Sequence, residues 1–306
     1  MHGPSELHRK HRPRTWDDFI GQETAIAQFK GFKKIPQALM LVGASGCGKT
    51  SAARVLRHVL GVAKSDYHEV NAASSRGIDT VRQYELVMAK YALEKAKMCV
   101  WDEAHKLTSD AQTALLKVLE DPTRDAHYVL CTTDPEKLLK TIRTRCTKVE
   151  FRPVSEGGLL KLLRKVCKAE GLSVIENVLV EIAEAAEGGP RLALNLLNQI
   201  AGVKDVTEQL EIVKKTQTKK MAHELCSLLL FKQPKWVQVA SMVESMDQEP
   251  EEIRRICLAY FSKVVLSGNA AASKAAAFIY DIQDTPWDRC GKAGLVSFCY
   301  RHFSKK

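Results

Sequence analysis

The chain has 306 residues, of which 45% are hydrophobic and 27% are charged, the profile of a globular protein with room for two or three domains. No apolar run approaches the ~18 residues that a membrane-spanning helix needs. Residues 1–15 lack the apolar stretch of a secretory signal. We therefore expect a cytoplasmic protein (the host cytoplasm, if a virus encodes it).

Cysteine spacing and net charge indicate which metals and partners the protein could bind. The nine cysteines include no pair at C-x-x-C spacing, so the sequence does not support a zinc site. The formal net charge is +10, and residues 1–100 carry 16 Lys and Arg against 9 Asp and Glu. A basic surplus favours a polyanionic partner, although a solvated charged surface explains the charge equally well.

Five short apolar runs have the length and composition of buried strands. Helical patterns lie between most of them. Strands that alternate with helices predict a parallel sheet with helices on both faces, and we place this α/β domain at residues 1–152. The five runs are Ala38–Val42, Tyr67–Val70, Met98–Trp101, His127–Thr132 and Thr147–Phe151.

Pro153 ends this alternation, and no convincing strand follows it. Helical stripes predict a small helical domain over residues 153–216 and a second helical region over residues 217–306. The apolar faces of the last region fit the core of a helical bundle. Some of them could also face neighbouring subunits, and the sequence does not separate the two.

The strongest motif is GASGCGKT, which matches G-x-x-x-x-G-K-[ST] directly after a strand and before a helix. In such a phosphate loop (Walker A), backbone N–H groups point at phosphate oxygens and the helix adds the positive end of its dipole. Lys49 can reach the β- and γ-phosphates of ATP, and Thr50 can ligate Mg²⁺. The predicted nucleotide-binding residues of this loop are Gly43, Ala44, Ser45, Gly46, Cys47, Gly48, Lys49, Thr50 and Ser51.

A second motif, KMCVWDEAHKL, ends an apolar strand in Asp102-Glu103. We expect Asp102 to lie near the Mg²⁺ ion and Glu103 to orient and polarise the attacking water. The alternative is that the two residues are simply an acidic pair on the surface. The upstream phosphate loop makes this alternative the weaker of the two interpretations. The letters DEAH also name a helicase group, but no other motif of that group occurs here.

Two further segments place polar residues at the ends of predicted elements, one at the end of a strand and one at the start of a helix. The stretch YVLCTTDPEKLLKTIRTRC ends a strand at Thr132-Thr133 and continues to Arg145, and GGPRLALNLLNQI places Arg191 in the first turn of a helix. A polar residue beside Asp102 could bind the γ-phosphate. An arginine at a domain edge could reach a neighbour's nucleotide, because its planar guanidinium donates two parallel hydrogen bonds. From the physics alone, a solvated surface arginine is the more common outcome.

These motifs resemble those of the AAA+ ATPases of sliding-clamp loaders: the small subunits of replication factor C, the bacterial gamma/tau subunit and the ATPase subunit of T4-like phage loaders. Five blocks occur in the family's order. The chain lacks the cysteine zinc module of the gamma/tau subunit, so the replication factor C or bacteriophage branch is the better match, and phage is favoured. The blocks are KHRPRTWDDFIGQ, the phosphate loop, NAASSRGIDTVR, the Asp-Glu strand with TALLKVLEDP, and the stretch ending in Thr144-Arg145-Cys146.

The resemblance implies a role for each matched residue. Thr133 corresponds to sensor 1, Arg145 to the arginine finger that completes the next subunit's site, and Arg191 to sensor 2. The segment of Arg12 and Pro13 corresponds to the part of the family that lies against the adenine and ribose, with His11 in place of the usual tyrosine. The second and third domains correspond to a helical lid and an oligomerisation collar. The implied contacts to DNA phosphates are Ser75, Arg76, Gly77 and Arg82.

The implied function is ATP-driven opening of a sliding clamp and its loading onto primer–template DNA during replication. The implied partners are other loader subunits in a pentamer, the clamp, and DNA bound without regard to sequence. One alternative is another DNA-directed AAA+ motor, such as a branch-migration helicase or an initiator-type ATPase. Another alternative is a subunit that binds ATP without hydrolysing it. The Asp102-Glu103 pair argues against this alternative.

Overall fold

The computed structural model describes residues 7–90, 92–123, 125–232, 234–246, 249–268, 270–283 and 287–304. Contacts between residues divide the chain into two compact units, Met1–Val206 and Thr207–Lys306. In the described part of the chain, the strands lie in the first unit and the second unit is helical.

The first unit contains a sheet of five parallel strands in the order β2-β3-β4-β1-β5. The α/β fold predicted from the alternating pattern is therefore confirmed. The edge strand β2 begins five residues before the predicted run, because its first half is polar and carries no apolar signal. The strands are β1 (Ala38–Val42), β2 (Val62–Asn71), β3 (Ala96–Asp102), β4 (Ala126–Thr132) and β5 (Thr147–Glu150).

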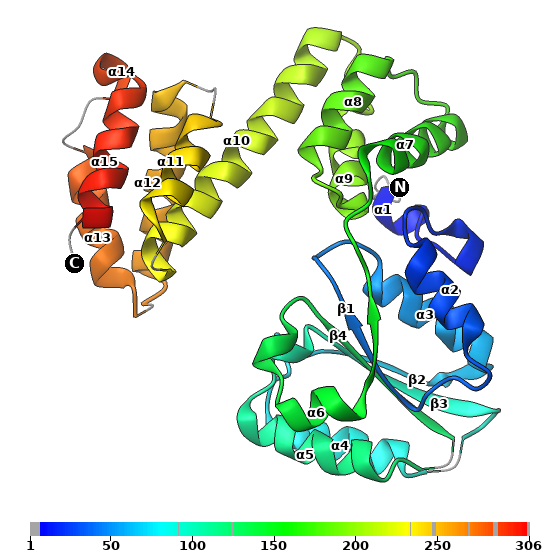
Figure 1. The fold of residues 1–306 in the computed structure, drawn as a ribbon. Helices are drawn as coiled ribbons and strands as arrows, with labels where there is room; N and C mark the ends of the chain where they lie inside the picture. The colour runs from blue at the N-terminus through cyan, green and yellow to red at the C-terminus, as the bar shows by residue number, and fades with distance from the viewer. Residues whose placement is uncertain are drawn as a thin grey trace. The chain divides into compact units, whose positions relative to one another are not determined.

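Helices cover both faces of this sheet (Figure 1). Alternate residues of β1 point to opposite faces, as the period of a strand requires. Leu39 and Leu41 pack in the core cluster that includes Leu56 of α3. Met40 belongs to the cluster on the other face, with Leu115 of α5. The helices are α2 (Glu23–Gly31) and α3 (Lys49–Leu60) on one face, and α4 (Ile78–Met88), α5 (Ser109–Glu120) and α6 (Lys140–Arg145) on the other.

Three helices follow the sheet in the same unit: α7 (Glu156–Glu170), α8 (Glu176–Ala185) and α9 (Pro190–Ile200). The Ser155 hydroxyl caps α7 by accepting the N–H of Gly158, and α9 starts at a proline, which a first helical turn tolerates. The short helix α1 (Leu7–Lys10) packs against α9. Three short 3₁₀ helices are η1 (Trp16–Asp18), η2 (Ala104–Lys106) and η3 (Pro135–Lys137).

The second unit is a bundle of helices around an aromatic core. The rings of Phe261 and Phe278 meet edge to face at 5.1 Å, and those of Phe278 and Phe298 at 5.7 Å. No helix in the described ranges is both long and apolar enough to cross a membrane. The helices are α10 (Val206–Phe231), α11 (Trp236–Glu244), α12 (Pro250–Leu266), α13 (Ala272–Gln283), α14 (Trp287–Cys290) and α15 (Lys292–Ser304).

Candidate nucleotide-binding site

The phosphate loop is the tight connection between the end of β1 and the start of α3. Its glycines allow close approaches that a side chain would block. A Cβ atom on Gly43 would lie 2.3 Å from the carbonyl oxygen of Phe151, and one on Gly46 would lie 3.1 Å from the Cβ atom of Arg191. Gly46 also has a φ of +80°, in the left-handed region that favours glycine. The loop therefore packs closely against Phe151, just after β5, and against Arg191 at the start of α9.

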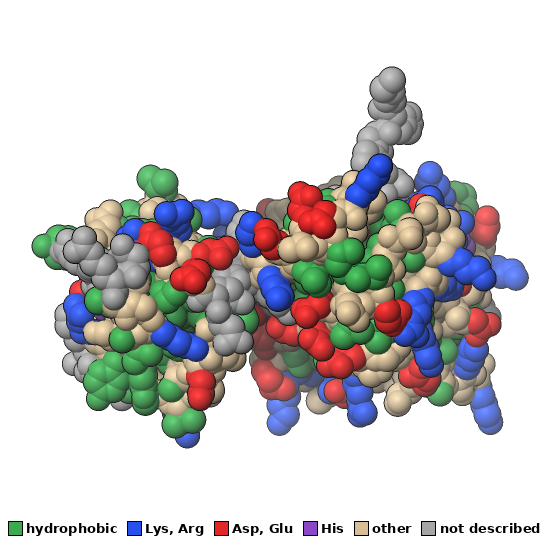
Figure 2. All heavy atoms as spheres, turned by 90° about the horizontal axis from the view of Figure 1, so that it is seen from above, with side chains coloured by type: hydrophobic (Ala, Val, Ile, Leu, Met, Phe, Trp, Pro, Cys, Tyr) green, Lys and Arg blue, Asp and Glu red, His purple; other side chains and the backbone are tan. Residues whose placement is uncertain are grey.

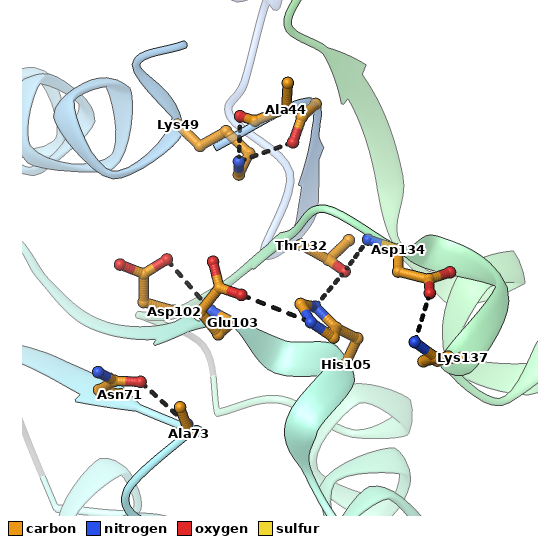
Figure 3. Close-up of polar contacts among 11 residues, drawn as sticks. Ala44, Lys49, Asn71, Ala73, Asp102, Glu103, His105, Thr132, Asp134 and Lys137 are labelled. Carbon is orange, nitrogen blue, oxygen red and sulfur yellow. Dashed lines mark hydrogen bonds and ion pairs between the residues drawn. The ribbon is translucent and has the colours of Figure 1, made fainter. Parts of the chain in front are cut away.

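Lys49 is the first residue of α3, and its side chain is buried. Its Nζ atom donates hydrogen bonds to the carbonyl oxygens of Gly43 at 2.7 Å and Ala44 at 2.8 Å (Figure 3). These bonds hold the ammonium group against the loop, from where it can reach phosphate oxygens. The thiol of Cys47 is buried and donates to the Ala44 carbonyl at 2.9 Å. Burial raises the pKa of this thiol, which disfavours the reactive thiolate form.

The two predicted metal ligands meet at the end of β3. The Thr50 hydroxyl donates to Asp102 Oδ2 at 3.0 Å. A hydroxyl and a carboxylate oxygen are the hard donors that Mg²⁺ prefers, and both residues line the same pocket. The pair therefore fits a Mg²⁺ ion, which Thr50 and Asp102 would hold.

Glu103 follows Asp102 in a strained conformation. Its φ is +54°, in the left-handed region that non-glycine residues seldom occupy. Its N–H donates to Asp102 Oδ1 at 3.1 Å, and its Oε2 lies 3.4 Å from His105 Nε2 (Figure 3). About a third of its side chain is exposed, at 34%. Such strain persists only where surrounding contacts hold it, and it clusters at functional sites.

One pocket joins the phosphate loop, the N-terminal segment, α7 and the start of α9. It contains most of the residues predicted to bind ATP and Mg²⁺, including Arg12, Pro13, Asp102, Glu103 and Arg191. Gly43 and Ala44 do not line it, although their carbonyls hold Lys49. The lining residues are His8, His11, Arg12, Pro13, Asp18, Phe19, Ile20, Gln22, Ser45, Gly46, Cys47, Gly48, Lys49, Thr50, Ser51, Asp102, Glu103, Leu162, Pro190, Arg191 and Leu194.

The predicted sensor 1 residue, Thr133, lies just beyond β4 with an exposed side chain and outside the pocket lining. Its neighbour Thr132 is fully buried, and its hydroxyl contacts His105 Nδ1 at 3.1 Å. The assignment of Thr133 stays a prediction. The contacts of Thr132 and His105 were not predicted from the sequence.

Arg145 ends α6, outside the pocket of its own chain. Its guanidinium pairs with Glu120 at 2.6 Å and is partly exposed. The segment before α6 is held by Gln112, whose side-chain amide donates to the Lys137 carbonyl at 3.2 Å and accepts the Leu139 N–H at 2.8 Å. Arg145 thus lies on the surface of its own chain, and its assignment as an arginine finger stays a prediction.

The predicted DNA-contacting residues lie around the start of α4. Gly77 precedes the first turn, Ser75 donates its N–H to the Asn71 carbonyl at 3.0 Å, and the Arg76 carbonyl accepts the N–H of Thr108 at 3.0 Å. The side chains of Arg76 and Arg82 are exposed. The backbone is thus fixed from both sides, while the two basic side chains face solvent.

Gln22 is a site residue whose role the sequence did not indicate, although it ends the first matched block. It is buried, and its amide donates to the carbonyls of Arg152 at 2.6 Å and Cys47 at 3.4 Å. Its Oε1 accepts the N–H of Arg152 at 3.1 Å. Gln22 therefore connects the phosphate loop to the segment that leads from β5 into α7.

Sequence comparison places relatives of this chain among DNA replication proteins. Residues 63–155 match the family described as DNA polymerase III, delta subunit. The replication factor C small subunit of Archaeoglobus fulgidus is 33% identical over 217 residues, which cover 68% of this chain and 68% of that protein. The DNA polymerase III subunit tau of Bacillus subtilis is also 33% identical, over 63% of this chain. The chain spans only 39% of that bacterial relative's length.

The chain therefore belongs to the AAA+ clamp-loader family, the class of protein that the phosphate loop and the Asp-Glu strand indicate. Within it, the match over two thirds of both chains is to the replication factor C small subunits. Identity to the bacterial and the archaeal relatives is the same, so it does not separate the two branches, and a bacteriophage source stays a prediction.

Among solved structures, the Thermotoga maritima RuvB Holliday junction branch migration motor has a similar fold. The TM-score is 0.57 at 19% identity, over 77% of this chain and 86% of that chain. At this identity the likeness shows the fold alone, and it agrees with an AAA+ α/β domain followed by helices.

We expect Gln22→Leu to lower the free energy of unfolding by about 1–2 kcal/mol, because it leaves the part-buried N–H and carbonyl of Arg152 without their partner. Chemical denaturation of the full chain measures this change. The matched control is Gln28→Leu, which removes one exposed bond to the Lys148 carbonyl and should change stability by less than about 0.5 kcal/mol. Equal effects of the two substitutions would show that Gln22 does not hold these segments together.

Proposed function

We propose that this chain is an ATP-driven subunit of a sliding-clamp loader, which opens the clamp and places it on primer–template DNA. The observation that carries the proposal is the pocket that gathers Lys49, Thr50, Asp102, Glu103 and Arg191. Family membership supports the same reading. The predicted division into an α/β domain (1–152), a lid (153–216) and a collar (217–306) is part of the proposal.

The pocket residues account for the steps of ATP hydrolysis. The loop N–H groups and Lys49 bind the phosphates, and Thr50 and Asp102 hold the metal. Bound Mg²⁺ neutralises charge on the β- and γ-phosphates. Glu103 accepts a proton from water as the water oxygen bonds to the γ-phosphorus. The bond from that phosphorus to the β–γ bridging oxygen breaks, which releases ADP and phosphate.

The proposed assembly is a pentamer in which Arg145 of one subunit meets the γ-phosphate held by the next. Arginine suits this role because it stays charged and donates paired hydrogen bonds to phosphate. Full occupancy by ATP then stabilises an arrangement of subunits that grips an open clamp, and hydrolysis releases the clamp. Thr133 and Arg191 would sense the γ-phosphate from within the same chain.

DNA binding is assigned to the region where α4 begins. Arg76 and Arg82 supply exposed positive charge there, suited to backbone phosphates and not to base edges. On the face drawn in Figure 2, basic and acidic side chains are intermixed, so the net charge of +10 alone does not identify the DNA-binding surface. The matched block NAASSRGIDTVR is what favours α4.

The second candidate is a branch-migration motor, because RuvB shares the fold. Identity of 33% to replication factor C small subunits, against 19% to RuvB, favours the clamp loader. ATP hydrolysis measured with DNA, with clamp, and with both separates the two. Stimulation that needs DNA and clamp together supports the proposal. Stimulation by DNA alone, indifferent to any clamp, supports a different DNA-directed motor.

We expect Arg145→Ala to abolish DNA-stimulated ATP turnover, since an arginine finger is typically worth ~10³–10⁵ in rate. ATP binding should change little, because Arg145 lies outside the pocket of its own chain. Steady-state turnover and equilibrium ATP binding measure the two effects. Arg143→Ala, two residues earlier in α6, is the matched control. Wild-type turnover in the Arg145 variant would remove the finger assignment.

We expect Arg82→Glu to weaken DNA stimulation of ATP turnover, and more so at low salt, because each phosphate contact contributes to the salt dependence of binding. The concentration of primer–template DNA that gives half-maximal stimulation, measured at several salt concentrations, tests this. An unchanged value at low salt would show that α4 does not face DNA.

A further inference from the structure

A series of polar contacts connects Glu103 to residues that have no role in the proposed hydrolysis. His105 Nε2 is 3.4 Å from Glu103 Oε2, and His105 Nδ1 is 3.1 Å from the Thr132 hydroxyl (Figure 3). That hydroxyl also accepts the N–H of Asp134 at 3.0 Å. His105 and Thr132 are 8% and 0% exposed, so solvent does not compete for the contact between these two side chains. These contacts connect the end of β3 to the end of β4.

The Thr132 hydroxyl has one hydrogen and two lone pairs, so its contact with His105 Nδ1 is compatible with either tautomer of the neutral ring. The Thr132 hydroxyl accepts from Asp134 and has one hydrogen of its own, which it can donate to His105 Nδ1. In the arrangement in which the hydroxyl donates to Nδ1, the neutral imidazole carries its proton on Nε2. In that arrangement Nε2 is the donor nitrogen of the ring, and it lies 3.4 Å from Glu103 Oε2.

The surroundings favour the neutral ring. Burial lowers the pKa of His105, and the charged groups around it are of both signs: Glu103 and Asp134 against Lys106 and Lys137. A neutral imidazole donates from Nε2 without placing a full positive charge beside the base. The separation of 3.4 Å is slightly long for a hydrogen bond, but catalytic contacts commonly shorten when substrate binds.

We propose that His105 and Thr132 are positioning residues for Glu103 in ATP hydrolysis. The Thr132 hydroxyl fixes the tautomer of the ring, and the ring holds one carboxylate oxygen of Glu103, so the other oxygen is free to meet the attacking water. A base oriented by a second group, which a third group orients in turn, is the arrangement known from activated nucleophiles. This inference rests on the proposed ATPase function and names residues that no motif assigned.

The test uses the full chain and measures ATP hydrolysis without DNA or clamp. Thr132→Val keeps the shape of the side chain but removes the hydroxyl. It should lower kcat about tenfold, which corresponds to about 1.4 kcal/mol of transition-state stabilisation. KM for ATP should stay within about twofold, because neither residue lines the pocket. Thr132→Ser, which restores the hydroxyl, should recover most of the rate.

Three further variants sharpen the test. Thr113→Val removes an exposed hydroxyl that donates only to the Ser109 carbonyl and should not change the rate. His105→Ala should lower kcat at least as much as Thr132→Val. The double variant of Thr132 and His105 should be no slower than His105→Ala alone, because both residues act through one carboxylate.

The tautomer gives a readout that does not depend on turnover. Nitrogen chemical shifts of the His105 ring should show the proton on Nε2 in the wild type and a mixture of tautomers in Thr132→Val. Equal rates in Thr132→Val and the wild type, or equal losses in the valine and serine variants, would overturn the inference. So would a wild-type ring protonated on Nδ1. Failure of the clamp-loader proposal would appear elsewhere, as wild-type turnover that DNA and clamp together do not stimulate.

Discussion

The common edge at which the parallel strands end is the constraint on which the site depends. Because β1, β3 and β4 are parallel and adjacent in the order β3-β4-β1, their last residues meet at one edge. This edge brings the phosphate loop, which follows Val42, to within hydrogen-bond distance of Asp102. It also places Thr132, at the end of the strand between them, next to the histidine that contacts Glu103. Ligands of open α/β sheets bind at this edge for the same reason.

The strands and the phosphate loop could be predicted because their signals are local. Buried parallel strands read as continuous apolar runs, and the loop's glycines and lysine occur at fixed spacing. Gln22 shows what local signals miss. Its partner Arg152 is 130 residues away, and a glutamine just before a helix gives no sign of a distant partner. Only the folded chain identifies it as the connection between the loop and the segment before α7.

The pair Thr132-Thr133 marks another limit of prediction from sequence. Successive residues of a strand face opposite sides, so two adjacent threonines at a strand end have different surroundings. The family pattern singled out Thr133, which is exposed here, whereas the buried hydroxyl of Thr132 contacts His105. Likewise, the start of β2 could not be predicted because the first half of this strand is polar. An edge strand has fewer buried positions, so fewer apolar residues indicate where it begins.

The most direct test of the account is equilibrium binding of ATP to the chain with and without Mg²⁺, in the wild type and in Lys49→Ala. The account predicts that wild-type binding weakens by at least about tenfold, or about 1.4 kcal/mol, when Mg²⁺ is chelated, and that Lys49→Ala weakens binding by at least as much. Binding that is indifferent both to Mg²⁺ and to Lys49 would contradict it, because the phosphate loop and the Thr50–Asp102 pair would then not be the nucleotide site.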